Sequence, residues 1–397
     1  MRLVSALFSL LMLSSVAVAQ EVKPLRIGFL TDMNGPYTDN DGRGAIEAAK
    51  MAIADFGGKI LGRPIELVLG DHQNKPDIGV AIARRWYDKE NVDVIMDVNN
   101  SAVALAVSGL TKEKNKVLLA TSAASVDLTN KQCTPNTVQW LSDTYALAHN
   151  VAAAETKAGA KSWFIIAADY AYGRSLQEEA TKAIVENGGT VKGFVRHPIG
   201  TADFSSFIMQ AQGSGASVLG IANVSADFIN TVKQAHEFQL GMKIVGMNVY
   251  ILDVPAVGQA AMAGLQFVDV FYWDMDEKSR AWSQQRFFPV MKRMPTTNQA
   301  NAYQALIHYF RAVQAAGTTD TEAVMKKMKE LPLEDQTGSR GYVRADGRVI
   351  RDMYLFEIKS PAESKYPWDY YRVIKTLPGE TGYVPASESQ CPLLAKK

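Results

Sequence analysis

Small polar residues follow two apolar segments of the chain, where strands would end. Asn100 and Ser101 come after the apolar run of "VIMDVNNSAVALAV", and Ala123 and Ser125 hold the matching place in "LLATSAASVDLT". A helical pattern follows each group. The first N–H groups of a helix lack partners within the helix and carry the positive end of its dipole, so they favour an anion. We therefore predict that these four residues bind a carboxylate.

A simpler role is open for both serines. Serine is a preferred N-cap residue, so Ser101 and Ser125 each fit a plain helix cap. A single serine of this kind would carry no functional argument. What indicates a binding site is the repetition of the pattern at two adjacent strand ends.

Two sets of strand-like runs, each followed by a helical pattern, must position these residues. Near-continuous apolar strands separated by helices indicate parallel sheets covered on both faces. The runs are 25–30, 65–71, 92–98 and 116–121, then 162–169, 190–195, 217–223 and 243–248. Later, "DMYLFEIKS" and "WDYYRVIKTL" predict an antiparallel pair. The sequence therefore predicts an α/β protein with two Rossmann-like lobes.

The two sets share one plan at corresponding strand ends. "VIMDVNNSAVALAV" in the first set resembles "VLGIANVSADFINTV" in the second, where Asn223 takes the place of the first asparagine. Ligand crevices in open α/β sheets lie beyond the carboxyl ends of the strands. Two such lobes that face each other would enclose a ligand between their strand ends.

Bulk composition excludes several classes of partner. The chain has 397 residues, with 42 Lys and Arg against 41 Asp and Glu. This balance gives no field that would favour nucleic acid or an anionic membrane. The length suits two domains.

The N-terminus predicts export. A charged start, an apolar run over residues 3–13 and the stretch "SSVAVAQE" form a signal peptide with cleavage after Ala19. The apolar run is too short for a membrane anchor. Cys133 and Cys391 are then the two cysteines of an exported chain, so we expect a disulfide between them. Two unpaired thiols are the alternative, and no metal site is expected.

Several segments together resemble a known family. "IGFLTDMNGPYTDNDGRGAIEAAKMAIADFGG", "VIMDVNNSAVALAV", "LLATSAASVDLT", "AADYAYGRSL" and "TADFSSFIMQAQGSGASVLGIAN" appear in order. They resemble the periplasmic Leu/Ile/Val-binding-protein-like receptors of ABC importers, which have the type I periplasmic binding protein fold. The resemblance implies two lobes joined by a three-segment hinge, which close on a small ligand. The hinge segments would lie near 140–145, 271–274 and 338–343.

The three hinge segments set the expected domain boundaries. After the signal peptide of residues 1–19, the first lobe would comprise 20–141 and 274–338, the second 142–273 and 339–375, and a C-terminal tail of 376–397 would return to the first lobe.

The resemblance also implies which residues contact the ligand. The carboxylate would bind at Asn100-Ser101 and at 123–125. Family members that bind amino acids place an acidic residue after the strand that matches "KIVGMN", where this chain has Asn248. A neutral amide does little for a buried ammonium, so we expect a carboxylate ligand with no obligatory amine, such as an aromatic or keto acid. Asp227 or Asp253 could substitute if the alignment is shifted.

Aromatic residues would pack the rest of the ligand, because Tyr and Trp pair an apolar ring with a polar group. Tyr172 is the first candidate, because the family uses a tyrosine there. Asn223 and Asn248, at neighbouring strand ends of the second lobe, are also expected to contact the ligand. Tyr37 and Trp140 are further candidates, although a lobe core would explain each aromatic residue as well.

No motif indicates an enzyme or a cofactor. The loop after the first strand reads "TDMNGPY", without the G-x-G-x-x-G pattern of a dinucleotide site, and no G-x-S-x-G appears. We expect a monomer that partners an inner-membrane ABC permease. A sensor subunit of a membrane receptor is the alternative, and a periplasmic enzyme is a weaker one.

Overall fold

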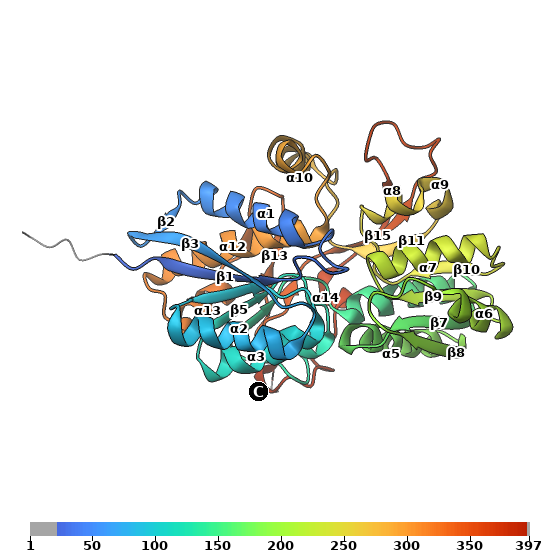
Figure 1. Ribbon diagram of the computed structural model, residues 1–397, viewed down its shortest axis with the longest axis horizontal. Coiled ribbons are helices and arrows are strands. Elements are labelled where there is room, and N and C mark those ends of the chain that lie inside the picture. Colours follow the sequence, from blue (N-terminus) through green and yellow to red (C-terminus); the bar gives the residue numbers. More distant parts are fainter. Residues whose placement is uncertain (1–21, 395–397) are drawn as a thin grey trace, which may run out of the picture.

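The computed structural model describes residues 22–394, which form two α/β lobes side by side along the long axis (Figure 1). The predicted signal peptide lies outside the described residues. The α/β fold with two lobes is confirmed. No helix within the described range has the length and apolar character needed to cross a bilayer.

The first lobe contains a six-stranded sheet in the order β2-β3-β1-β4-β5-β6. All neighbouring strands are parallel except the short β2–β3 pair. The strands are β1 (Leu25–Thr31), β2 (Lys59–Ile60), β3 (Arg63–Asp71), β4 (Val94–Asp97), β5 (Val117–Ala120) and β6 (Thr137–Gln139).

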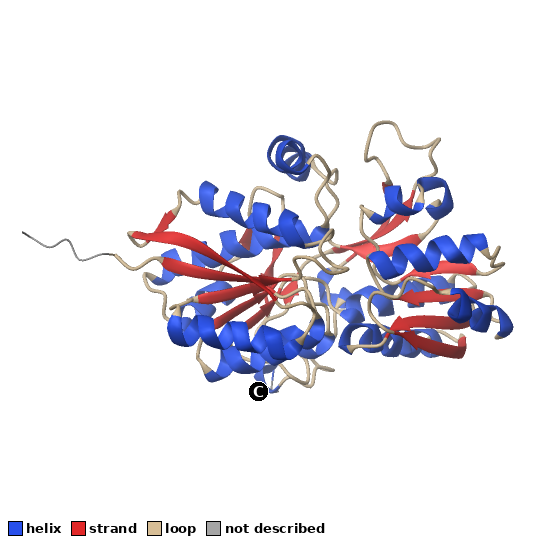
Figure 2. Ribbon diagram, viewed as in Figure 1, coloured by secondary structure: helices blue, strands red, loops and turns tan. Residues whose placement is uncertain are grey.

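Helices cover both faces of this sheet, as Figure 2 shows. Side chains alternate between the faces along each strand. Phe29 and Met96 therefore pack with one group of helices, and Leu30 and Ile95 with the other. The first group is α1 (Gly42–Asp55), α12 (Thr297–Ala316) and α13 (Thr321–Glu330), and the second is α2 (Pro76–Lys89) and α3 (Ser101–Glu113).

The second lobe repeats this arrangement around a parallel sheet in the order β10-β9-β7-β8. Its strands are β7 (Ser162–Ala168), β8 (Thr190–His197), β9 (Val218–Ala222) and β10 (Lys243–Gly246). One face packs on η2 (Tyr145–His149), α4 (Asn150–Lys157) and α5 (Ala171–Glu186). The other packs on α6 (Ser205–Gly213), α7 (Ala226–Glu237), α8 (Asp253–Val257) and α9 (Gln259–Met262).

Two antiparallel sheets complete the lobes. The predicted antiparallel pair forms β15 (Met353–Ile358) and β16 (Tyr371–Leu377), with β11 (Gln266–Asp269) beside β15. A small sheet of β12 (Leu333–Glu334), β13 (Arg340–Val343) and β14 (Val349–Ile350) packs on the first lobe. The remaining elements are η1 (Val126–Thr129), α10 (Glu277–Trp282), η3 (Ser283–Phe287), α11 (Phe288–Met291), α14 (Gly379–Gly382) and η4 (Pro392–Leu394).

The chain passes between the lobes three times, and core packing locates each passage. Trp140 packs in the core of the first lobe and Leu141 in that of the second. The second passage begins after β11, where Phe271 packs in the core of the first lobe while Tyr272 and Trp273 still pack in that of the second. The third lies at β14, beyond the expected segment 338–343, because β13 still packs on the first lobe.

A disulfide attaches the C-terminal tail to the first lobe. Cys133 and Cys391 are bonded, with their Cα atoms 5.7 Å apart and 258 residues of separation. The carbonyl oxygen of the Asn130 side chain accepts a hydrogen bond from the backbone N–H of Gln390. The predicted pairing is therefore confirmed.

We expect the double substitution Cys133→Ser and Cys391→Ser to lower the free energy of unfolding by about 2–4 kcal/mol, because the bond restricts the unfolded chain. Urea unfolding with and without reductant measures this. The reductant should shift the midpoint of the native chain and leave the double variant unchanged. An unshifted midpoint in both proteins would contradict the prediction.

Candidate functional site

A small cavity lies between the lobes, where the carboxyl ends of both parallel sheets meet. Its free volume of about 20 Å³ holds about one water molecule, so a larger solute can enter only when the lobes move apart. Most of the residues that line it come after β1, β4 and β5 of the first lobe and after β7, β9 and β10 of the second. The lining residues are Tyr37, Asp41, Asn99, Ser101, Ser122, Ala124, Leu141, Tyr170, Tyr172, Val224, Ser225, Asn248, Tyr250 and Asn298.

Four residues predicted to bind ligand line this cavity: Tyr37, Ser101, Tyr172 and Asn248. The Ser101 hydroxyl oxygen accepts a hydrogen bond from the backbone N–H of Ser125 at 3.1 Å, which leaves its own hydrogen free to donate. The Tyr37 hydroxyl donates across the lobes to that of Tyr170 at 2.9 Å. The Tyr172 hydroxyl accepts from the Asn248 amide at 2.9 Å.

Three other predicted residues of the first lobe support the strand ends from outside the cavity. The Asn100 side chain caps α3 by accepting from the N–H groups of Ala102 and Val103 at 3.0 and 3.2 Å. The Ser125 hydroxyl caps η1 and lines a separate groove of about 390 Å³. The Ala123 carbonyl accepts from the Gln139 amide at 3.0 Å. Helix capping, the simpler role, thus describes the hydroxyl of Ser125.

Trp140 and Asn223 lie deeper. Trp140 is fully buried in the core of the first lobe, where its indole N–H donates to Gln304 at 3.1 Å. The Asn223 amide nitrogen is hydrogen-bonded to His197 at 2.9 Å and to Thr231 at 3.1 Å, and the next two residues, 224 and 225, line the cavity instead.

Polar residues outside the predicted binding set also line the cavity: Asp41, Asn99, Ser122 and Asn298. Asp41 sits at the N-cap position of α1, where aspartate normally caps the helix, yet its side chain makes no capping hydrogen bond. Asn298 lies in the first turn of α12 and donates to the Asp41 carboxylate from 257 residues away in the sequence. Local pattern would have assigned Asp41 to the cap of α1, and no local signal marks Asn298 as a cavity residue.

A chain of hydrogen bonds links the lobes through the cavity. Asn298 donates to Asp41 at 3.1 Å and accepts from the Tyr250 hydroxyl at 3.2 Å. The Asn248 amide donates to the hydroxyls of Tyr250 at 3.3 Å and Tyr172 at 2.9 Å. Side chains from both lobes therefore hold the closed arrangement together.

Backbone strain accompanies this site in the second lobe. Ser225 has φ 61° and ψ −131°, a conformation rare for any residue with a side chain. Its hydroxyl accepts a hydrogen bond from the Asn40 amide of the first lobe at 2.8 Å. Strain of this kind concentrates at binding sites and hinges.

The cavity is acidic. Burial raises the pKa of Asp97, beneath the cavity, to about 6, although Thr121 and Ser122 donate to its carboxylate. Burial, followed by the charge of Asp97, holds the pKa of Asp41 well above its usual range. None of the lining residues is a lysine, arginine or histidine.

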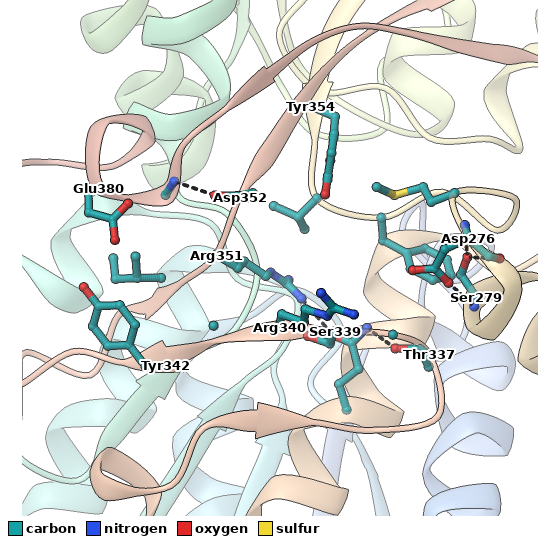
Figure 3. Close-up of a pocket in the computed structure, with 18 residues that line it drawn as sticks. Asp276, Ser279, Thr337, Ser339, Arg340, Tyr342, Arg351, Asp352, Tyr354 and Glu380 are labelled. Carbon is teal, nitrogen blue, oxygen red and sulfur yellow. Dashed lines mark hydrogen bonds between the residues drawn. The ribbon is translucent and has the colours of Figure 1, made fainter.

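A larger cavity of about 430 Å³ lies among the hinge segments (Figure 3). Three of its five charged groups, those of Arg351, Asp276 and Asp352, already make hydrogen bonds within the protein. Arg351 donates to Gln304 and Asn301, while Asp276 caps α10 through Ser279 and lies beside it in Figure 3. Because the strand ends of the parallel sheets do not line this cavity, we place the candidate site in the smaller one.

Comparison with known proteins agrees with this architecture. The family model described as periplasmic binding protein matches residues 24–365. A periplasmic binding protein from Burkholderia mallei is 46% identical, with a TM-score of 0.92 over 94% of this chain and 99% of that chain. A branched chain amino acid ABC transporter periplasmic ligand-binding protein from Burkholderia xenovorans is 38% identical, with a TM-score of 0.82 over 93% of this chain and 100% of that chain. Leu/Ile/Val-binding protein homolog 6 of Brucella suis biovar 1 is 23% identical over 94% of this chain and 96% of its own length.

Proposed function

The chain belongs to the type I periplasmic binding proteins of ABC transporters, and from this premise we propose that it captures a small carboxylate and delivers it to an inner-membrane ABC permease. The ligand classes are aromatic acids, keto acids and branched-chain amino acids. The observation that carries the proposal is the cavity enclosed by the facing strand ends of both lobes. Binding of this kind involves no covalent step.

Hinge closure is the proposed mechanism. The two lobes separate about the three passages, a ligand binds to the first lobe, and the second lobe closes over it. Closure makes contacts that exist only in the shut form, such as those between Tyr37 and Tyr170 and between Asn40 and Ser225. A ligand that bridges the lobes shifts the population toward this form, which the permease would recognise.

The walls of the cavity fit an acid with an apolar body. At one strand end of the first lobe, Ser101 offers a hydroxyl whose hydrogen is free to donate, whereas the Ser122 hydroxyl at the adjacent strand end donates to Asp97. Tyrosine rings from both lobes, together with Leu141 and Val224, surround the remaining space. The relative from Burkholderia xenovorans, which is 38% identical, is described as the periplasmic ligand-binding protein of a branched chain amino acid ABC transporter. This description supports a small ligand of similar size.

Residues 1–19 would direct the chain to the periplasm, where a monomer would meet its permease. Mass spectrometry of the exported protein tests the expected cleavage after Ala19. A mature chain that begins elsewhere or keeps its first residues would contradict this part of the proposal.

We expect Ser101→Ala to weaken carboxylate binding by about 1.5–3 kcal/mol, because it removes a hydrogen bond to a charged group. A thermal-shift screen of leucine, 4-methyl-2-oxopentanoate and benzoate selects the ligand, and titration calorimetry then compares the variants. Ser125→Ala is the matched control, because the hydroxyl of Ser125 caps η1 outside the cavity. Equal affinities of the native chain and Ser101→Ala would remove Ser101 from the site.

A further inference from the structure

We propose that the cavity of about 430 Å³ among the hinge segments is a second binding site, which takes a small oxyanion, a carboxylate or a phosphate, at Arg340 and Arg351. This site goes beyond the proposed function. Among the described residues, none lines both this cavity and the one between the strand ends, so the two sites are separate. The volume lies within the usual range of pockets for small molecules, roughly 300–1,000 Å³.

Arg351 is the buried cation of this cavity. It is 5% exposed, and its two Nη atoms donate to neutral oxygens, those of the Gln304 and Asn301 side chains and of the Trp140 carbonyl. Its buried Nε atom has no hydrogen-bond partner among residues 22–394. A buried charge with only neutral partners is costly, and an N–H group without a partner adds to that cost. An anion in the cavity would reduce both costs.

The protein does not supply the missing counter-charge from the described part of the chain. The charges of Asp269 and Asp335 reach Arg351, but each of these carboxylates accepts a hydrogen bond from a threonine hydroxyl instead. Burial lowers the pKa of Arg351, and the nearby guanidinium of Arg348 lowers it as well. The surroundings of Arg351 are therefore short of negative charge.

Arg340 brings a second guanidinium group to the same cavity. It lies on β13, is exposed, and forms no side-chain hydrogen bond or ion pair with any residue of the described range. In Figure 3 the ends of Arg340 and Arg351 extend into the cavity and toward one another. Burial raises the pKa of the Tyr354 hydroxyl, and both arginine charges oppose this rise, so both groups lie near this one side chain. Two like charges that converge in this way favour an anion beside them.

The acidic residues of the cavity do not cancel this preference. Asp276, Asp352 and Glu380 line it, and all three are exposed. The Asp276 carboxylate caps α10, and that of Asp352 accepts from the backbone N–H of Gly379 at 3.0 Å. Solvent and salt screen exposed charges much more than buried ones. The charge that a ligand would feel most strongly is therefore that of Arg351.

Two hydroxyl groups would complete the binding of an oxyanion. Ser339, next to Arg340, lines the cavity, and its buried hydroxyl has no hydrogen-bond partner within the described chain. The Tyr354 hydroxyl, on β15 of the second lobe, likewise makes no hydrogen bond to another described residue. Hydrogen bonds to an ionised acceptor are about twice as strong as neutral ones. A carboxylate or phosphate group would thus receive donors from both lobes.

Titration calorimetry on the mature chain tests the site with two probes, inorganic phosphate and citrate, in buffers of one fixed ionic strength. We expect at least one of them to bind with a stoichiometry of one, and the comparison shows which kind of oxyanion the site prefers. Arg340→Gln should weaken that binding by about 10- to 100-fold, the range of one charge-assisted hydrogen bond. Because Arg340 is exposed and unpaired within the described range, its loss should leave the urea midpoint unchanged.

Two control variants locate the anion. Arg84→Gln removes the same charge from an exposed position on α2, outside the cavity, and should bind the anion as the native chain does. Ser101→Ala changes the cavity between the strand ends and should also keep anion binding.

Three results would overturn the inference. The first is that neither phosphate nor citrate binds the native chain, and the second is that Arg340→Gln binds the anion as tightly as the native chain. The third is a loss of anion binding in Ser101→Ala, which would place the anion between the strand ends. The first two results leave the proposed function untouched, because the ligand of that function is tested at Ser101 with other probes.

Discussion

Replacing Asp143 with alanine should lower the free energy of unfolding by about 3–5 kcal/mol, because it leaves Arg348 buried without its counter-charge. Both residues are almost completely buried, with side-chain exposures of 2% for Asp143 and 0% for Arg348. The Arg348 Nη1 atom lies 3.7 Å from the Asp143 carboxylate. Neither Nη atom has a hydrogen-bond partner among the described residues, so the ionic contact is the main compensation for the guanidinium.

The surroundings of this pair explain its importance. Burial raises the pKa of Asp143 in spite of the attraction of Arg348, and burial lowers the pKa of Arg348. The guanidinium also lies over the Tyr383 ring, 5.0 Å from its centre. Asp143 follows the first passage between the lobes and Arg348 immediately precedes the third, so the pair ties two hinge segments together.

Two further variants separate charge from shape. Asp143→Asn keeps an acceptor for the Ala146 N–H, which bonds to Asp143 at 2.8 Å, but it removes the charge. The double variant Asp143→Leu with Arg348→Met removes both charges and should recover much of the loss, since a matched apolar pair can replace a buried ion pair. Urea unfolding measures all three. A loss below about 1 kcal/mol in Asp143→Ala would contradict the expected role of the pair.

Trp140→Ala should also lower the free energy of unfolding by about 3–5 kcal/mol, because it leaves a large cavity in the core of the first lobe. Trp140 is fully buried, and its indole N–H donates to Gln304. Gln304 also accepts from Arg351 at 2.8 Å, at the third passage. The substitution therefore removes core packing and one partner from a buried polar contact.

Trp140→Phe distinguishes a core residue from a ligand residue. This variant keeps most of the apolar volume, so it should lose less stability and leave ligand affinity unchanged. Ser101→Ala should do the reverse, with weaker binding and a small change in stability. Denaturant unfolding and titration calorimetry on the same preparations give both numbers. A ligand affinity that falls in Trp140→Phe while stability holds would place Trp140 at the site instead.

Local pattern was sufficient to predict the architecture. Apolar runs of strand length between helical patterns gave the two parallel sheets, because a strand buried on both faces needs no alternation. The antiparallel pair β15–β16 followed from a local pattern, whereas the disulfide between Cys133 and Cys391 followed from the presence of two cysteines in a chain with an export signal. The third passage between the lobes had no such signal, because β13 packs on the first lobe through contacts far apart in sequence.

At the candidate site, the sequence indicated the strand ends and some of the side chains that face the cavity, such as Ser101 and Tyr172, but it missed others, such as Asn99. Asn99 and Asn100 are neighbours, and the backbone decides between them. Asp97 and Val98 have φ of 75° and 55°, which turns the chain sharply after β4. As a result Asn99 lines the cavity and Asn100 caps α3.

The amino-acid sequence by itself therefore determined the fold class, the tail disulfide and the sheet edge that carries the site, because each depends on local periodicity or on residue type. Only the tertiary structure decided which polar groups meet there. Asp41 and Asn298 come together from parts of the chain that lie 257 residues apart, and Asp41 is 2% exposed only because folding buries it. Burial and the partners available to a buried group are properties of packing, which no local pattern encodes.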